Sequence, residues 1–122
     1  MTGDPEDEGV LPRSYLRIAL LAFLAEGPAH GYDLLEQVGR AGIRTADAGG
    51  LYRSLRAMEH DGVVVSWWET STSGPPRRTY ELTPSGRDVL AAEASALRNM
   101  LGLLTDFVER VDEALKPSGS SQ

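Results

Sequence analysis

The chain has 122 residues, a net charge of −6 and no cysteine. This length allows one small domain with an appended helix, and such a domain has a core too small for a large active-site cleft, so binding is favoured over catalysis. The lack of cysteine excludes disulfides, thiolate metal sites and cysteine nucleophiles. Because His30 and His60 have no accompanying pattern of carboxylates, we expect no catalytic site, no metal site, no enzyme activity and no cofactor.

The negative charge is distributed unevenly along the chain. Residues 1–12 carry a charge of −4, residues 13–83 carry eight arginines against eight acids, and residues 84–122 carry −2. We interpret residues 1–13 as an acidic flexible N-terminal arm. The first apolar run has no basic leader and is too short to span a bilayer, so we expect a cytoplasmic protein that does not contact membranes.

Two helices are predicted in the first third of the chain. Residues 16–25 are almost wholly apolar, and Pro28 ends this run. A second helical pattern begins at residue 31 and has Tyr32, Leu35 and Val38 at helical spacing as its apolar side. Together with the next helix they predict a helix-turn-helix, in which the third helix occupies the recognition position.

The third helix is predicted from about Ala48 to Asp61, with Asp47 as its N-cap and Gly62 as its left-handed C′ residue. Its core side consists of Leu51, Leu55 and Met58. A second stripe is left for a partner and contains Gly49, Tyr52, Arg53 and Arg56. The first turn also includes Gly50 and has no bulky side chain, which would let its backbone approach a phosphate. The alternative is an ordinary surface helix with solvated arginines.

The pattern after the third helix changes to that of a β-hairpin. Residues 63–70 are β-branched and aromatic, and residues 77–83 form a second short run that starts with two arginines, Arg77 and Arg78. The six residues between these runs are small and polar, as in a turn. A hairpin directly after a helix-turn-helix predicts the wing of a winged helix.

Two adjacent tryptophans lie in the first of these strands. Because alternate residues of a strand face opposite sides, we expect Trp68 to pack on the helices and Trp67 to lie nearer solvent or the dimer cleft. Aromatic pairs most often serve packing alone. The alternative interpretation is a platform for a planar ligand.

One long helix is predicted over residues 84–116, with Thr83 as N-cap and Pro84 at N1, and residues 117–122 are predicted to be a disordered tail. Its apolar residues recur at spacings of four and three, as in a heptad seam: Leu90, Ala94, Leu97, Leu101, Leu104, Val108, Val111 and Leu115. We interpret it as a dimerisation helix; the alternative is an intramolecular hairpin with the first helix. A second apolar stripe, which includes Phe107, predicts additional packing on the winged-helix body.

Several short motifs resemble those of the PadR family of transcriptional regulators. In chain order they are Leu20 and Leu21, EGPAHGYDL (26–34), GGLYRSL (49–55), EHDG (59–62) and GPPRRTYELTPSG (74–86). The resemblance implies a homodimeric repressor of the shorter branch, with a single C-terminal dimerisation helix and, in many members, a response to small aromatic compounds, drugs or stress signals. Some members hold a planar drug between tryptophans of that helix, whereas here the helix has no tryptophan and offers Phe107.

The sequence therefore predicts a mainly α fold with a small β-hairpin, in which residues 14–83 form a winged helix-turn-helix. We expect a homodimeric DNA-binding regulator whose partner is double-stranded DNA with an inverted-repeat operator. The predicted DNA contacts are Gly49, Gly50, Tyr52, Arg53, Arg56, Arg77 and Arg78, and the candidate contacts to a small aromatic ligand are Trp67, Trp68 and Phe107. The neutral charge of this region favours one alternative, a ligand- or protein-binding winged-helix module that does not bind operator DNA.

Overall fold

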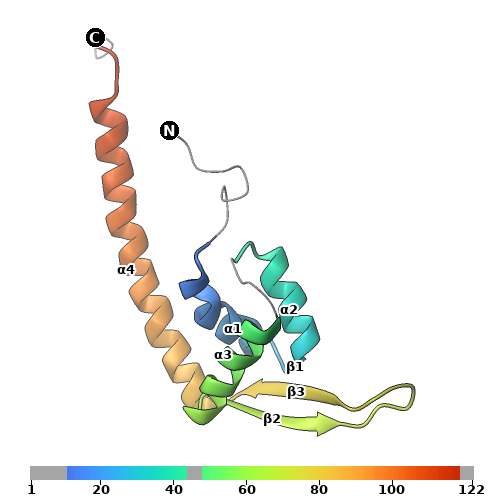
Figure 1. The fold of residues 1–122 in the computed structure, drawn as a ribbon. Helices are drawn as coiled ribbons and strands as arrows, with labels where there is room; N and C mark the ends of the chain where they lie inside the picture. The colour runs from blue at the N-terminus through green and yellow to red at the C-terminus, as the bar shows by residue number, and fades with distance from the viewer. Residues whose placement is uncertain (1–10, 44–47, 119–122) are drawn as a thin grey trace. The chain divides into compact units, whose positions relative to one another are not determined.

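The computed structural model describes residues 11–43 and 48–118. Most of the predicted arm, the predicted cap Asp47 and the end of the predicted tail lie outside the described residues. The elements run in the order η2 (Arg13–Tyr15), α1 (Leu16–Ala25), β1 (Ala29–His30), α2 (Gly31–Arg40), α3 (Ala48–His60), β2 (Val64–Glu69), β3 (Arg77–Leu82) and α4 (Pro84–Ala114) (Figure 1). The fold class predicted from the sequence is confirmed.

The helices α1, α2 and α3 pack around one apolar core. It contains four leucines of α1 together with the predicted core side of α3. Its fully buried members include Leu20, Leu21, Leu24, Leu34, Leu51, Leu55 and Met58. The expected apolar side of α2 is wrong at Tyr32, which is 66% exposed. The buried side of α2 instead runs through Gly31, Leu34 and Val38, which recur at i, i+3 and i+7.

The sheet has three antiparallel strands in the order β1-β3-β2. The predicted hairpin of β2 and β3 is confirmed, and its turn end extends away from the three helices (Figure 1). Sequence reasoning missed β1, in which Ala29 and His30 pair with Tyr80 and Thr79. Two residues are too few to show the alternation by which a strand is recognised. The short strand ties the start of α2 to the wing.

The junction between the wing and α4 is held by the predicted N-cap. The Thr83 hydroxyl accepts a hydrogen bond from the Gly86 N–H at 2.9 Å and donates one to the Gly62 carbonyl at 2.8 Å. Gly62 has the predicted left-handed conformation, with a φ of 80°. A Cβ on the buried Gly86 would overlap the carbonyl oxygen of Val63, so the first turn of α4 requires a glycine here.

The start of the described chain is part of the fold. Leu11 forms an isolated parallel bridge with Ile43, and its N–H donates to the Gly42 carbonyl at 2.7 Å. The last residues of the predicted arm are therefore ordered by backbone pairing. Among the described residues, no helix is both long and apolar enough to cross a membrane.

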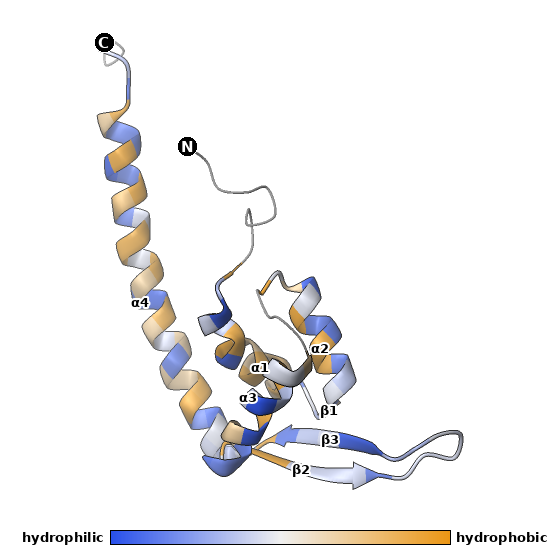
Figure 2. Cartoon of the chain, viewed as in Figure 1, coloured by the Kyte–Doolittle hydropathy of each residue, from blue (hydrophilic) through white to orange (hydrophobic). Residues whose placement is uncertain are grey.

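The chain divides into two compact units, residues 1–90 and residues 91–122. Within the first unit, Val89 and Leu90 of α4 pack against the core. The described part of the second unit consists of the remainder of α4, which ends at Ala114, two residues before the predicted end, and of residues 115–118. The apolar residues of this unit recur along its length, in orange in Figure 2, and most are exposed: Met100, Leu101, Leu103, Leu104, Phe107, Val108, Val111 and Leu115. Phe107 of the second stripe is 62% exposed, and the expected packing of this stripe on the winged helix stays a prediction.

Candidate nucleic-acid interface

A groove of about 800 Å³ lies between the start of α2, the recognition helix α3 and the wing. We call it the wing groove. Its lining includes three arginines, two carboxylates and four aromatic rings: Arg56, Arg77, Arg78, Asp33, Glu59, Tyr32, Tyr52, Trp68 and Tyr80. The structure thus brings together predicted site residues from α3 and from β3, which are more than 20 residues apart in the sequence.

On the α3 side, Tyr52, Arg56 and Glu59 recur at i, i+4 and i+7 and face the wing groove. Arg53 is exposed but is not part of the groove lining, so α3 presents its two arginines on adjacent sides. At the start of α3, Gly49 is exposed whereas Gly50 is buried. This differs from the expectation that both glycines offer their backbone to a phosphate.

Tyr52 is half-buried and packs partly on the core. Its ring lies across Gly31 at the start of α2, because a Cβ built on Gly31 would stand 2.6 Å from the Tyr52 ring carbon Cε1. Gly31 therefore allows α2 and α3 to approach closely at the groove. Tyr52 forms part of the groove wall and is less free to reach outward than the sequence suggested.

On the wing side, the register pairs Trp68 with Arg78 and Glu69 with Arg77. Trp68 lies on the same strand face as Val64 and Ser66, as predicted. At the start of the strand this face points toward the core, because Val64 is buried. The expectation that Trp68 packs on the helices is nevertheless wrong, because it is 63% exposed, against 36% for Trp67.

The physical reason is the length of the hairpin. Its first residue, Val64, is buried in the core, whereas the strand is exposed from Trp67 onward. The turn end of the hairpin extends away from the helices (Figure 1). The two tryptophans lie on opposite strand faces, so they do not form one flat ligand platform. The candidate ligand residues Trp67, Trp68 and Phe107 share only that each is exposed.

A chain of polar contacts connects α3 to the wing. The Ser66 hydroxyl donates to the Glu59 carboxylate at 2.7 Å, and Arg78 Nη2 lies 3.8 Å from the same carboxylate. The Arg78 guanidinium also lies over the Trp68 ring, 5.2 Å from its centroid. Arg78 is thus held from two sides. Neither Arg56 nor Arg77 has an ion-pair partner within the described part of the chain.

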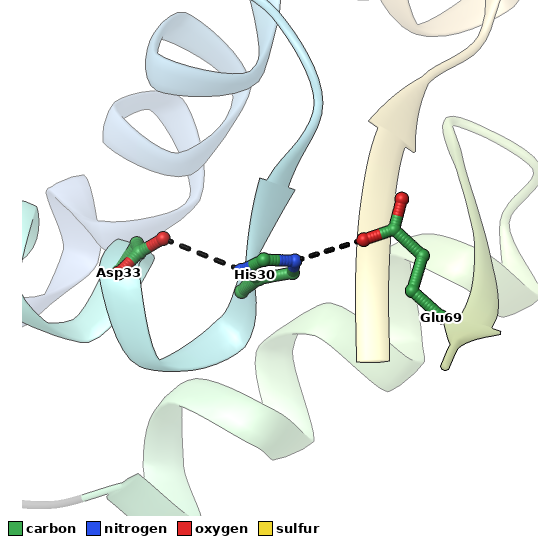
Figure 3. A network of polar contacts seen from close by, with 3 residues as sticks. All are labelled: His30, Asp33 and Glu69. Atoms are coloured by element: carbon green, nitrogen blue, oxygen red, sulfur yellow. Dashed lines mark hydrogen bonds and ion pairs between the residues drawn. The ribbon is translucent and has the colours of Figure 1, made fainter. Parts of the chain in front are cut away.

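His30 connects the start of α2 to the far end of β2 (Figure 3). Its Nε2 lies 3.0 Å from Glu69 Oε1, and its Nδ1 lies 3.5 Å from Asp33 Oδ2. The hydrogen bond from His30 is the largest cause that lowers the pKa of the Glu69 carboxyl. The two carboxylates lie at opposite nitrogens of the ring and so do not converge on one point (Figure 3). The described residues contain no group of three or more His, Asp or Glu side chains that could hold a metal ion.

Tyr80 lies buried at the inner side of the wing groove. Burial is the largest cause that raises the pKa of its hydroxyl, so Tyr80 is neutral at neutral pH. Tyr80 therefore adds no charge to the groove.

Sequence reasoning missed several lining residues, above all His30, Asp33 and Glu59. Glu59 does lie three residues after Arg56 and seven after Tyr52, and this spacing indicates that it shares their helix face. His30 and Asp33 had no such signal, because their place at the groove depends on the unpredicted strand β1.

The family described as transcriptional regulator PadR-like matches residues 20–92. The chain belongs to the PadR-like family of transcriptional regulators. A transcriptional regulator of Mycobacterium tuberculosis is 34% identical over 88 residues, which cover 72% of this chain and 80% of that protein. The family is one of regulators and not of enzymes, which agrees with the expectation that the chain is not an enzyme.

Solved structures of PadR family regulators share the fold. One from Eggerthella lenta is 30% identical with a TM-score of 0.69, and the match covers 80% of this chain and 84% of that one. One from Clostridium difficile is 26% identical with a TM-score of 0.70, covering 77% and 98%. Bacillus subtilis PadR in complex with operator DNA is 22% identical with a TM-score of 0.59, covering 65% and 46%, a likeness of fold alone.

Proposed function

We propose that this PadR-like regulator binds operator DNA as a homodimer and acts as a repressor. The observation that carries the proposal is the wing groove, in which Arg56 of the recognition helix lies with Arg77 and Arg78 of the wing. Phosphate contacts depend on the local field of such arginines and not on the net charge, so the overall charge of −6 is no obstacle. The related fold of Bacillus subtilis PadR, solved with operator DNA, supports this proposal.

We assign separate roles to the exposed arginines. Arg53 and Arg56, on the recognition helix, are the proposed base-reading residues, because an arginine can donate two hydrogen bonds to a guanine in the major groove. Arg77 and Arg78 on the wing are proposed to contact the backbone. The exposed backbone at Gly49 and the edge of Tyr52 complete the proposed DNA surface.

The dimer is proposed to form through α4. The seam continues the heptad spacing along the second unit, from the half-buried Leu97 through the exposed Leu104 to the exposed Val111. A seam of this length in solvent is unfavourable for an isolated chain, and pairing with a second copy would cover it. The remaining proposed interface residues are Leu90, Leu101, Val108 and Leu115.

Regulation by a small aromatic molecule is also proposed, with Trp67, Trp68 and Phe107 as candidate contacts. All three rings are exposed, so each offers a face on which a planar ligand can stack.

The operator itself tests the proposed function. A random duplex library would be incubated with the full chain, and bound duplexes would be amplified and sequenced over several rounds. We expect an inverted repeat whose half-site centres lie about 10 bp or a multiple apart, because a two-fold dimer presents its recognition helices to successive major grooves. Arg98→Ala on α4 serves as the control and should select the same repeat. No enrichment in any round would contradict operator binding and favour a module with another ligand.

A further inference from the structure

We propose that Trp68 is a DNA-contact residue, whose ring packs on the sugar-phosphate backbone beside Arg78. The inference rests on the proposed DNA binding and adds Trp68 to the proposed DNA contacts. From the sequence, this residue was interpreted as a packing residue or as part of a ligand platform.

The first observation is the position of Trp68. It lies in the wing groove with Arg56 and Arg77, and nearly two thirds of its surface is open to solvent. It is not among the residues that pack on the core. An indole left exposed on a concave surface therefore stabilises the fold little through burial and indicates a surface for a partner.

The second observation is that arginines surround Trp68. The Arg78 guanidinium lies 5.2 Å from the ring centroid, and Arg56 and Arg77 line the same groove without an ion-pair partner among the described residues. A partner that covers both an apolar ring and several guanidinium groups needs apolar and anionic parts in alternation. The backbone of duplex DNA has this chemistry, since deoxyribose presents carbon surface between phosphates.

The third observation separates Trp68 from Arg78. The Glu59 carboxylate lies 3.8 Å from Arg78 and is itself held by the Ser66 hydroxyl at 2.7 Å. This anchor does not involve Trp68, so Arg78 keeps one of its two supports when the indole is removed. Glu59 is accordingly a positioning residue for Arg78, and Trp68 makes a contact of its own.

Fluorescence tests the contact, because the chain has only two tryptophans and they face opposite sides of β2. Trp67→Phe leaves Trp68 as the single reporter, and Trp68→Phe leaves Trp67 as the matched control. Both full-chain variants would be titrated with acrylamide, with and without a random-sequence duplex. We expect the duplex to protect Trp68 from quenching and to leave the quenching of Trp67 unchanged. Equal accessibility of Trp68 in the free and bound protein would overturn the inference.

Binding affinity supplies a second measurement. Trp68→Ala should weaken duplex binding by about fivefold or more, as expected for removal of an aromatic ring from a nucleic-acid contact. Its salt dependence should stay that of the parent, whereas Arg78→Gln should lower the slope by about one per bound protomer. An affinity loss in Trp68→Ala with the same slope change as Arg78→Gln would mean that Trp68 only supports Arg78, which contradicts the inference.

The outcomes distinguish the inference from the function on which it rests. If the parent chain binds duplex while Trp68 stays accessible and Trp68→Ala binds normally, the inference fails and DNA binding stands. If the parent chain binds no duplex at any salt concentration, the proposed function fails, and the inference with it.

Discussion

Single residues carry the connection between the wing and the helices. His30 was assigned no role from the sequence, yet its ring bridges Glu69 of the wing and Asp33 of α2. Its position follows from β1, which places it opposite Thr79. The same contact lowers the pKa of Glu69 and so makes one interaction of the wing dependent on pH.

We predict that His30→Phe, which removes the donor, raises the pKa of Glu69 toward its ordinary value, because the hydrogen bond from His30 is the largest cause of the lowering. A carboxyl with a lowered pKa stabilises the fold above its ordinary pKa, and this contribution is lost as the pH falls through the lowered value. Carbon NMR titration of the glutamate carboxyls in both proteins measures the change. His60→Phe is the control, and an unchanged Glu69 titration in His30→Phe would count against the contact.

Whole elements were predicted with different success, and the reasons are physical. The helices α1 and α3 and the cap of α4 have clear signals, such as apolar periodicity and the Thr83 hydroxyl, and these were confirmed. β1 has two residues and arises only from pairing with β3, so no local sequence pattern predicts it. The exposure of Trp68 depends on how far the hairpin extends past the helices, a tertiary property that strand alternation does not contain.

The junction between the wing and α4 gives a matched pair of glycine substitutions. Gly86→Ala should destabilise the fold by about 1–3 kcal/mol or more, because the new methyl group would overlap the backbone carbonyl of Val63. Gly102→Ala, in the same helix, has open space around its Cβ and should stabilise α4 by up to about 1 kcal/mol. Urea unfolding followed by circular dichroism compares them, and equal effects of the two would contradict the packing described for residue 86.

At the scale of the whole molecule, the protein combines a winged helix with a heptad seam whose apolar residues are largely exposed in a single chain. The seam is visible in the sequence because its spacing is local. The wing groove is not visible in the sequence, because its lining comes from β1, α2, α3, β2 and β3, which only the fold brings together.

Charged substitutions in the heptad seam test whether the chain forms a dimer through α4. We predict that the parent chain is a dimer and that Leu101→Glu with Leu104→Glu is a folded monomer, since buried unpaired charges cost several kcal/mol. Both positions are exposed in the single chain, so the core of the first unit should remain intact. Ser95→Glu, at a position outside the heptad seam, is the control. Multi-angle light scattering gives the masses; a monomeric parent chain or an intact dimer of the double variant would refute assembly through this seam.

The central claim is that the wing groove of this PadR-like regulator holds the backbone of duplex DNA. It is tested most directly by the salt dependence of binding to a random-sequence duplex, measured by fluorescence anisotropy. The parent chain should bind more weakly as salt rises, and the Arg77→Ala/Arg78→Ala pair should lower the slope by about two per bound protomer, one for each lost phosphate contact. Arg98→Ala, which removes one arginine outside the groove, should keep the parent slope. Parent binding without salt dependence, or an unchanged slope in the wing pair, would contradict the claim.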